Sequence, residues 1–293
     1  MIATPIQQEA ATGLPPAVSA KGYRNRDWPL WAYLLVIAAL TFIPFAIMLL
    51  ISVKSSAQYA VSPIGVTPPF HFENYLYAIK TVWRPVFNSS LVAVVSIAGT
   101  LAASSLTAFA FALLPFPGRT VLFFAILALL MIPGILLLVP RYVIVAHLHL
   151  LNSYFALILP YIAGGQAFNV LVLRTFFTSI PGEIVDAARV DGAGYWKVFT
   201  SVVLPLSRPI MAAMAILQLL SIWNDYIWPA VTIDSVNLRT LTVSLRYLQD
   251  AFGLSQWGAI MASYTVASLP LVIVFALTTR TFIQGMTSGA LKV

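Results

Sequence analysis

Cysteine is absent from this sequence of 293 residues, and charged residues make up only 9% of it. The absence of cysteine excludes disulfide bonds and thiolate metal sites. Soluble domains carry about 25% charged residues. A chain with so few charges and 60% hydrophobic residues cannot cover its surface with polar groups in water. The composition therefore predicts an integral membrane protein.

The usual catalytic motifs are also missing. The sequence contains no G-x-x-x-x-G-K-[ST] phosphate loop, no H-E-x-x-H zinc motif and no G-x-S-x-G nucleophile turn. His147 and His149 are two residues apart, so on a helix they would point in different directions. We therefore expect no catalytic residues, no metal site and no cofactor in this chain, which is not predicted to be an enzyme.

Six hydrophobic runs are long enough to cross a bilayer, which needs about 20 apolar residues. They cover residues 29–53, 86–114, 119–145, 153–176, 206–231 and 259–284. Every run contains proline or glycine, and such breaks are tolerated where neighbouring protein satisfies the backbone. We expect an all-α membrane domain of six bent helices over residues 28–293, preceded by a disordered tail over residues 1–27.

The net charge of +7 does not indicate a nucleic-acid partner, because the basic residues are scattered near the ends of the hydrophobic runs. In a membrane protein such charges report orientation, since lysine and arginine collect on the cytoplasmic side. With the N-terminus inside, ten of these residues fall on the inner side and six on the outer side. The protein is therefore predicted to lie in the inner or plasma membrane, with both termini in the cytoplasm.

The same orientation puts the charge-rich loop 180–209 in the cytoplasm. Pro181 can occupy the first turn of a helix, where its missing N–H costs nothing, and Glu183 then meets the positive end of the helix dipole. Asp191 and Gly192 predict a break, because glycine accepts the left-handed conformation of a C-terminal cap. The loop is thus expected to be a short helix, a glycine turn and a second amphipathic helix.

The first of these helices has a small apolar face, made by Ile184, Ala187 and Ala188 at helical spacing. Asp186 and Arg189 are three residues apart and can pair beside that face. From the residues alone, the segment is either a helix lying on the lipid headgroups or a surface that a partner protein approaches closely.

The spacing of this loop resembles the "EAA" cytoplasmic loop of importer-type ABC permeases. Asp186-Ala187-Ala188, Gly192, Val202 and Leu204-Pro205 stand at that motif's positions, with Asp186 in place of the usual glutamate. The resemblance implies that the loop seats in a cleft of an ATP-hydrolysing partner. The residues expected to couple to that partner are Glu183, Asp186, Ala187, Ala188, Arg189, Asp191, Gly192, Leu204 and Pro205.

Further short motifs narrow the resemblance to the MalG-type permeases of carbohydrate ABC importers, over about residues 28–293. They are Asn88-Ser89-Ser90-Leu91, Phe116-Pro117-Gly118-Arg119, Met131-Ile132-Pro133, Pro140-Arg141-Tyr142, Trp223-Asn224-Asp225-Tyr226 and the tail from Gly285 to Lys292. The resemblance implies a type I importer fold in which this chain forms half of the pathway for a sugar or oligosaccharide. It also implies a second permease chain, a dimer of subunits that bind ATP and Mg²⁺, and an extracytoplasmic solute-binding protein. The tail is a second expected contact with the ATPase.

Polar residues within the hydrophobic runs are candidates for lining a substrate pathway, because they are expensive in lipid and tend to face a cavity. The aromatic face of Trp223 could cover the C–H bonds of a sugar while Asn224 and Asp225 take its hydroxyls. The alternative is that these groups bind neighbouring helices. The pathway candidates are Gln166, Asn169, Gln218, Trp223, Asn224 and Asp225, and Asn88 is a further polar residue of this kind.

The outer loops 54–84 and 232–257 carry several aromatic residues, which either form a belt at the bilayer surface or meet an external binding protein. An alternative function, ion-coupled secondary transport, requires acid and base groups within the membrane, and the runs offer essentially Asp225 alone. A membrane scaffold, the third possibility, does not require the spacing seen in loop 180–209.

Overall fold

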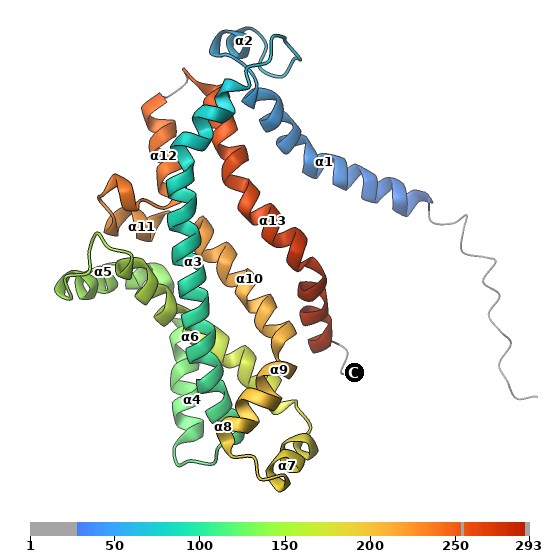
Figure 1. The fold of residues 1–293 in the computed structure, drawn as a ribbon, viewed down its shortest axis with the longest axis vertical. Helices are drawn as coiled ribbons and strands as arrows, with labels where there is room; N and C mark the ends of the chain where they lie inside the picture. Colours follow the sequence, from blue (N-terminus) through green and yellow to red (C-terminus); the bar gives the residue numbers. More distant parts are fainter. Residues whose placement is uncertain (1–27, 253–254, 291–293) are drawn as a thin grey trace, which may run out of the picture. The chain divides into compact units, whose positions relative to one another are not determined.

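The computed structural model describes residues 28–252 and 255–290, and its chain divides into two units, residues 1–47 and 48–293. The described part of the first unit is residues 28–47 of helix α1 (Trp28–Ser52), which is apolar on every side. The predicted N-terminal tail, residues 1–27, lies outside the described residues. Every regular element of the described chain is helical (Figure 1).

Four helical segments in the described chain are long and apolar enough to cross a membrane without a break. They are α1, α3 (Glu73–Leu113), α6 (Phe155–Thr178) and the Trp257–Thr279 part of α13 (Trp257–Ala290). Two bent helix pairs bring the number of spans to as many as six. The first joins Arg119–Met131 to Gly134–His147 at 95°, and the second joins Tyr195–Leu206 to Arg208–Asn224 at 71°. The predicted all-α membrane fold is confirmed.

The bends fall where proline interrupts the backbone hydrogen bonds. In the first pair, α4 (Arg119–Ala128) and the 3-10 turn η1 (Leu129–Met131) end before Pro133, and the chain resumes with η2 (Gly134–Leu137) and α5 (Leu138–His147). The second bend lies at Ser207, between Pro205 in α9 (Leu204–Leu206) and Pro209 in α10 (Arg208–Asn224). Proline lacks an N–H and its ring crowds the carbonyl four residues back, so a straight helix cannot continue through these positions.

Two predicted boundaries differ from the structure. Helix α3 begins at Glu73 rather than at residue 86, because its first turns carry Glu73, Lys80 and Arg84, which a search for apolar runs passes over. The run predicted over 206–231 ends as α10 at Asn224 and continues as the short helix α11 (Ile227–Thr232) after an extended residue, Asp225.

Helix α3 packs against α6, α10 and α13 and forms the centre of the second unit. Near its middle, Val92 belongs to a buried cluster with Leu157 and Trp228. Toward its C-terminus, Phe109 packs with Phe177 and Phe199 in a second cluster, with 5.1 Å between the ring centroids of Phe109 and Phe199. The same helix buries small polar side chains, Ser96, Thr100, Ser104 and Ser105, which allow close approach of its neighbours.

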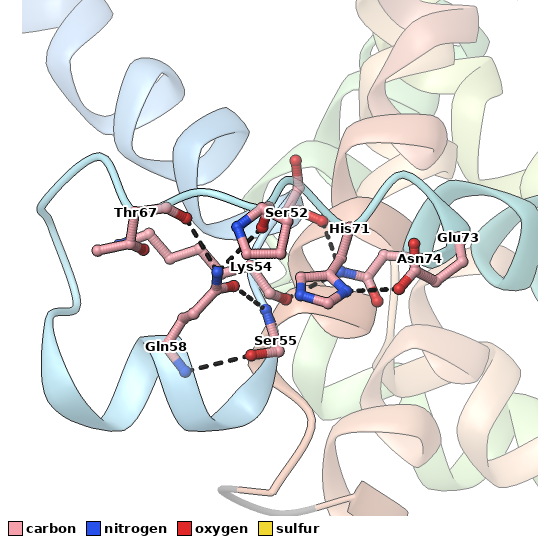
Figure 2. Close-up of polar contacts among 9 residues, drawn as sticks. Ser52, Lys54, Ser55, Gln58, Thr67, His71, Glu73 and Asn74 are labelled. Atoms are coloured by element: carbon pink, nitrogen blue, oxygen red, sulfur yellow. Dashed lines mark hydrogen bonds and ion pairs between the residues drawn. The ribbon is translucent and has the colours of Figure 1, made fainter.

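At the end of this unit opposite the C-terminus of α3, residues 52–74 fold into a small structure (Figure 2). We call it the outer cap, after the orientation predicted from the lysine and arginine residues. Its helix α2 (Ser56–Val61) starts with a capping box, in which Ser55 and Gln58 bond to each other's backbone N–H. The Gln58 amide nitrogen also donates to the carbonyl of Thr67 at 3.0 Å. These bonds fold residues 62–70 back over α2.

The outer cap contains a buried lysine. Lys54 is 1% exposed, and its Nζ donates to the carbonyls of Ser62 at 2.6 Å and Pro63 at 3.1 Å. The Asn74 side chain, from the start of α3, donates to the carbonyls of Ser52 at 2.9 Å and Lys54 at 3.0 Å. Lys54 therefore holds the cap closed, while Asn74 ties it to α3.

The outer loop after α11 is tied to α3 in a similar way. The Asn88 amide nitrogen donates to the carbonyls of Asn237 and Arg239, both at 2.9 Å, while its oxygen accepts a bond from the Tyr154 hydroxyl at 2.8 Å. The adjacent Ser89 hydroxyl accepts the N–H of Leu241, the first residue of α12 (Leu241–Phe252). Asn88 is thus engaged by neighbouring elements on both ends of its side chain.

Candidate coupling surface and translocation pathway

The loop expected to couple to an ATPase begins with helix α7 (Gly182–Val190), which lies at the opposite end of the second unit from α2 and α12 (Figure 1). Glu183 lies in its first turn, as predicted, whereas Pro181, expected within that turn, precedes the helix as its N-cap residue. Gly192 has a φ of +81°, the left-handed conformation expected at the break. The N–H of Ala193 bonds to the carbonyl of Ala188 at 2.9 Å and that of Gly192 to Arg189 at 3.0 Å, which is the Schellman pattern of helix ends.

Helix α7 has an inner and an outer face. Val185 and Ala188 are partly buried and pack against the cluster that contains Phe177 and Phe199. The opposite face is exposed and carries Glu183, Ile184, Asp186, Ala187 and Val190, the last with 87% of its surface accessible. The exposed face combines two carboxylates with small and medium apolar groups, so it can meet a partner surface that is both basic and apolar.

Arg189 does not pair with Asp186, so that prediction is wrong. Among the described residues, the Arg189 guanidinium donates to the Tyr195 hydroxyl at 3.3 Å and lies 5.0 Å from the centre of the Tyr195 ring. Tyr195 begins the next helix, so this contact joins the two helices across the glycine turn. The carboxylate of Asp186 consequently stays on the exposed face.

The second half of the loop connects α7 to the bundle. Helix α8 (Tyr195–Val198) continues into a π-helical turn, η3 (Phe199–Val203), and then into α9. Such wide turns occur where a helix must absorb an irregularity, here Pro205, which cannot donate to the preceding turn. Leu204 is partly buried in the same cluster as Val185 and Ala188. The loop therefore rests on the ends of α3 and α6 through one continuous apolar contact.

The tail from Gly285 to Lys292, the other expected ATPase contact, is only partly described. Helix α13 runs to Ala290, whereas residues 291–293 and the side chains from 280 onward lie outside the described residues.

Two of the pathway candidates, Asn169 and Gln218, meet across α6 and α10 at a pocket of about 260 Å³. Gln218 donates to the Thr100 hydroxyl and Asn169 to the Gly165 carbonyl, both at 2.7 Å. Their side-chain carbonyl oxygens are buried and form no hydrogen bond within the described part of the chain. The pocket is lined by Gly165, Phe168, Asn169, Met214, Leu217, Gln218 and Ser221.

Ser221 was not among the predicted pathway residues, although its spacing could have indicated it. It lies three residues after Gln218 and three before Asn224, so the three polar side chains share one side of α10. Ser221 and Asn224 are exposed. Gln166, in contrast, donates to the carbonyl of Ile162 one turn earlier in α6 and does not line this pocket.

Trp223 and Asn224 point in different directions. Trp223 is 6% exposed and packs in a cluster with Val82, Leu241 and Leu245, while its carbonyl accepts a hydrogen bond from Thr242. The Asn224 amide nitrogen donates to the carbonyl of Leu220 at 2.8 Å.

Asp225 lies at the break between α10 and α11. Its carboxylate accepts the Tyr161 hydroxyl at 2.8 Å and the Trp228 N–H at 3.3 Å. Arg141 lies with its guanidinium carbon 4.0 Å from the centre of the Trp228 ring, and Trp228 also donates to the carbonyl of Ala156. Asp225 thus fixes the start of α11 against α6, in a position that is neither fully buried nor fully exposed.

A bent helical bundle with a projecting capped helix at one end, and a pocket beside α10 that holds two amide side chains, is typical of a membrane-spanning transport subunit. Comparison with known families makes this specific. Residues 96–288 match the family of binding-protein-dependent transport system inner membrane components, so the chain belongs to that family. It is the multi-pass, non-catalytic permease subunit of an ABC importer, and it works with a binding protein and with a separate ATPase that binds the ATP.

Curated relatives cover nearly the whole chain. The arabinooligosaccharides transport system permease protein AraQ of Halalkalibacterium halodurans is 33% identical, over 91% of this chain and 96% of that protein. The sn-glycerol-3-phosphate transport system permease protein UgpE of Brucella abortus is 31% identical, over 87% of this chain and 94% of that protein.

A solved structure shares the fold. A chain of a bacterial ABC transporter involved in the import of the acidic polysaccharide alginate superposes with a TM-score of 0.74, covering 89% of this chain and 99% of that chain at 23% identity. The predicted type I importer permease fold is therefore confirmed.

Proposed function

We propose that this chain forms half of the translocation pathway for a sugar or an oligosaccharide, beside a second, homologous permease chain. The observation that carries the proposal is α7, a short capped helix that exposes Glu183, Asp186 and Ala187 at one end of the bundle. The names of the relatives, which refer to arabinooligosaccharides and glycerol phosphate, support the carbohydrate assignment.

In this proposal a dimer of ATPase subunits holds the exposed face of α7 in a cleft. Closure of the dimer on ATP moves α7, and the apolar contact through Val185 and Ala188 passes that movement to α3 and α6. The free energy comes from the different affinity of ATP for the open and closed dimer, as any ligand-driven shift requires. The loop residues Arg189, Asp191, Gly192, Leu204 and Pro205 keep α7 in place and belong to the coupling unit.

The solute is proposed to pass along the polar side of α10. Asn169, Gln218, Ser221 and Asn224 offer amide and hydroxyl groups, and two buried amide oxygens there are available to accept bonds from sugar hydroxyls. Gln166, Trp223 and Asp225 belong to the helices that frame this groove. The outer cap and the loop before α12 are proposed to receive the solute-binding protein.

Transport by the reconstituted complex tests the function. The complex is placed in vesicles with its ATPase and binding protein, and uptake of arabinotriose, maltotriose, sn-glycerol 3-phosphate and an alginate trisaccharide is measured. ATP-dependent uptake of at least one saccharide is expected. If none of the four is taken up while ATP is hydrolysed, the carbohydrate assignment is wrong.

An Ala187→Trp variant tests the role of α7. The added indole would occupy the space needed by the partner, so we expect loss of uptake with an intact fold. Thr120→Trp, an exposed position at the start of α4 near the same end of the bundle, is the control. Normal uptake by Ala187→Trp would show that α7 does not couple this chain to the ATPase.

Orientation is tested with single cysteines, which the natural sequence lacks. Asp191→Cys should be labelled by an impermeant maleimide only from the cytoplasmic side, and Ser56→Cys in α2 only from outside. The reverse pattern would invert the proposed topology, in which both termini are cytoplasmic.

A further inference from the structure

A second pocket lies between the start of α11, α12 and α13. It measures about 390 Å³ and is lined by Tyr226, Thr242, Leu245, Arg246 and Tyr264. Leu245 and Tyr264 belong to the cluster around the buried Trp223, so one wall of the pocket is part of the core. Thr242 is held by its bond to the Trp223 carbonyl at 2.7 Å. The pocket therefore has a fixed wall and three polar side chains besides Thr242.

Those polar side chains keep unused bonding capacity. Within the described part of the chain, the hydroxyls of Tyr226 and Tyr264 form no hydrogen bond, and neither ring stacks on another aromatic ring or beneath a cation. Arg246 contacts Asp250 through Nε at 3.3 Å, and its two terminal nitrogens have no partner among residues 28–252 and 255–290. Thr242 donates its own proton, so its oxygen can still accept a bond.

This set of groups suits a sugar ring more than an ion. Tyrosine rings offer flat apolar faces to C–H bonds, together with a hydroxyl at the edge. The terminal nitrogens of Arg246 form a planar pair of donors, matched to two neighbouring hydroxyl oxygens. Asp250 does not line the pocket, but its ion pair with Arg246 offsets the charge of that guanidinium, which favours a neutral solute over an anion.

The position of the pocket connects it to the pathway. Tyr226 follows directly on Asn224 and Asp225, at the end of the polar side of α10. Gln218 and Asn224 are six residues apart, which is about 9 Å along a helix axis. The two pockets have no lining residue in common, and the chain connects them along the last two turns of α10.

We propose that this pocket is a binding subsite for one neutral sugar ring of the transported saccharide, where the solute enters the pathway from outside. Tyr226 and Tyr264 contact the ring faces, and Arg246 bonds its hydroxyls. Thr242 lies in the pocket wall, where its hydroxyl is already bonded to the Trp223 carbonyl. The inference rests on the proposed function, because it assigns a carbohydrate to the chain.

Protection of an introduced cysteine tests the subsite without relying on transport. Thr242→Cys places a thiol in the pocket, and Tyr247→Cys, on the same helix but outside the pocket, is the matched control. The purified complex is treated with a maleimide in the presence of arabinotriose, maltotriose, sn-glycerol 3-phosphate or an alginate trisaccharide, and labelling of this chain is followed by mass spectrometry. A neutral trisaccharide should slow labelling of Thr242→Cys at least about fivefold and leave Tyr247→Cys unchanged.

A second variant tests whether Arg246 recognises the sugar. Arg246→Gln in the Thr242→Cys background should abolish the protection, while Arg239→Gln, whose parent side chain stacks on Tyr247, should not. Absence of protection by every saccharide overturns the subsite. Protection only by the two anionic compounds overturns its assignment to neutral sugars, and a thiol already blocked by vesicle lipid in the absence of sugar shows a lipid site instead.

These outcomes separate the subsite from the wider function. If the complex takes up a saccharide but Thr242→Cys is not protected, the subsite fails and the function stands. If Thr242→Cys is protected but no saccharide is taken up, the transport assignment fails while the pocket still binds sugar.

Discussion

Replacement of Gly258 by alanine should detach the outer cap from α13. A Cβ at this position would lie 2.1 Å from the Lys54 carbonyl oxygen and 2.6 Å from the Asn74 side-chain nitrogen, whereas ordinary contact begins at 3.4 Å. The cap must therefore move by more than about 1 Å, since its nearest atom belongs to the backbone. That movement breaks the bonds from Asn74 to Ser52 and Lys54.

The expected loss follows from these contacts. Overpacking costs about 1–3 kcal/mol, and two hydrogen bonds contribute about 1 kcal/mol each. The gain in helix propensity from glycine to alanine returns about 1 kcal/mol. A net loss of about 2–4 kcal/mol corresponds to about a 30- to 700-fold increase in local opening of the cap.

Hydrogen exchange of the solubilised complex measures this opening directly. The reporter is the His71 amide, which bonds to the Val53 carbonyl at 2.7 Å across the cap. Gly164→Ala is the control, because a Cβ there meets no described atom within 4 Å. If the His71 amide stays as protected in Gly258→Ala as in the wild type, the contact between the cap and α13 does not have the importance assigned to it.

Three further substitutions test other parts of the structure. Lys54→Met removes the charged donor of two hydrogen bonds to the cap carbonyls of Ser62 and Pro63 and should cost about 1–3 kcal/mol. We expect faster proteolysis of residues 62–70, and equal cleavage in Lys54→Met and the exposed control Lys80→Met would contradict this. Gly192→Ala forces a φ of +81° on a residue with a Cβ, at a cost of about 1–2 kcal/mol. The amount of solute taken up per ATP hydrolysed should therefore fall, least in Gly192→Asn and most in Gly192→Pro. An unchanged ratio in the proline variant would show that coupling does not need this turn. Asp225→Ala leaves the Tyr161 hydroxyl and the Trp228 N–H without a partner, a loss of about 1–3 kcal/mol. The melting temperature of the complex should therefore be lower with Asp225→Ala than with Asp225→Asn. Identical melting temperatures would show that the Asp225 side chain does not fix α11.

The features that could be predicted from the sequence are local ones. Apolar runs of sufficient length indicate membrane helices, and the Pro181, Asp191 and Gly192 signals define α7 to within a residue or two, because capping depends on a few neighbouring atoms. The absence of catalytic motifs also needs no structure. In each of these cases the physical cause lies within one or two helical turns of the residues that reveal it.

The features that could not be predicted depend on contacts between distant segments. Asn88 lies in a hydrophobic run, which predicts a polar residue of the bilayer interior. In the structure its amide nitrogen donates to two carbonyls about 150 residues away in the sequence. Trp223 looked like a sugar platform, and the structure places its ring in the core. The Arg189 guanidinium bonds to the Tyr195 hydroxyl and not to the Asp186 carboxylate, because the glycine turn brings α7 and α8 together.

The length of α3 has a mechanical consequence. Its 41 residues extend about 60 Å, roughly twice the thickness of the hydrocarbon layer. Near its N-terminal end α3 is fastened to the outer cap through Asn74 and to the loop before α12 through Asn88. Near its C-terminal end Phe109 packs on Phe199, in the segment that follows α7. In the proposed orientation, a displacement at the α7 end would reach the surface where the solute arrives through this one helix, which contains a single proline, Pro85.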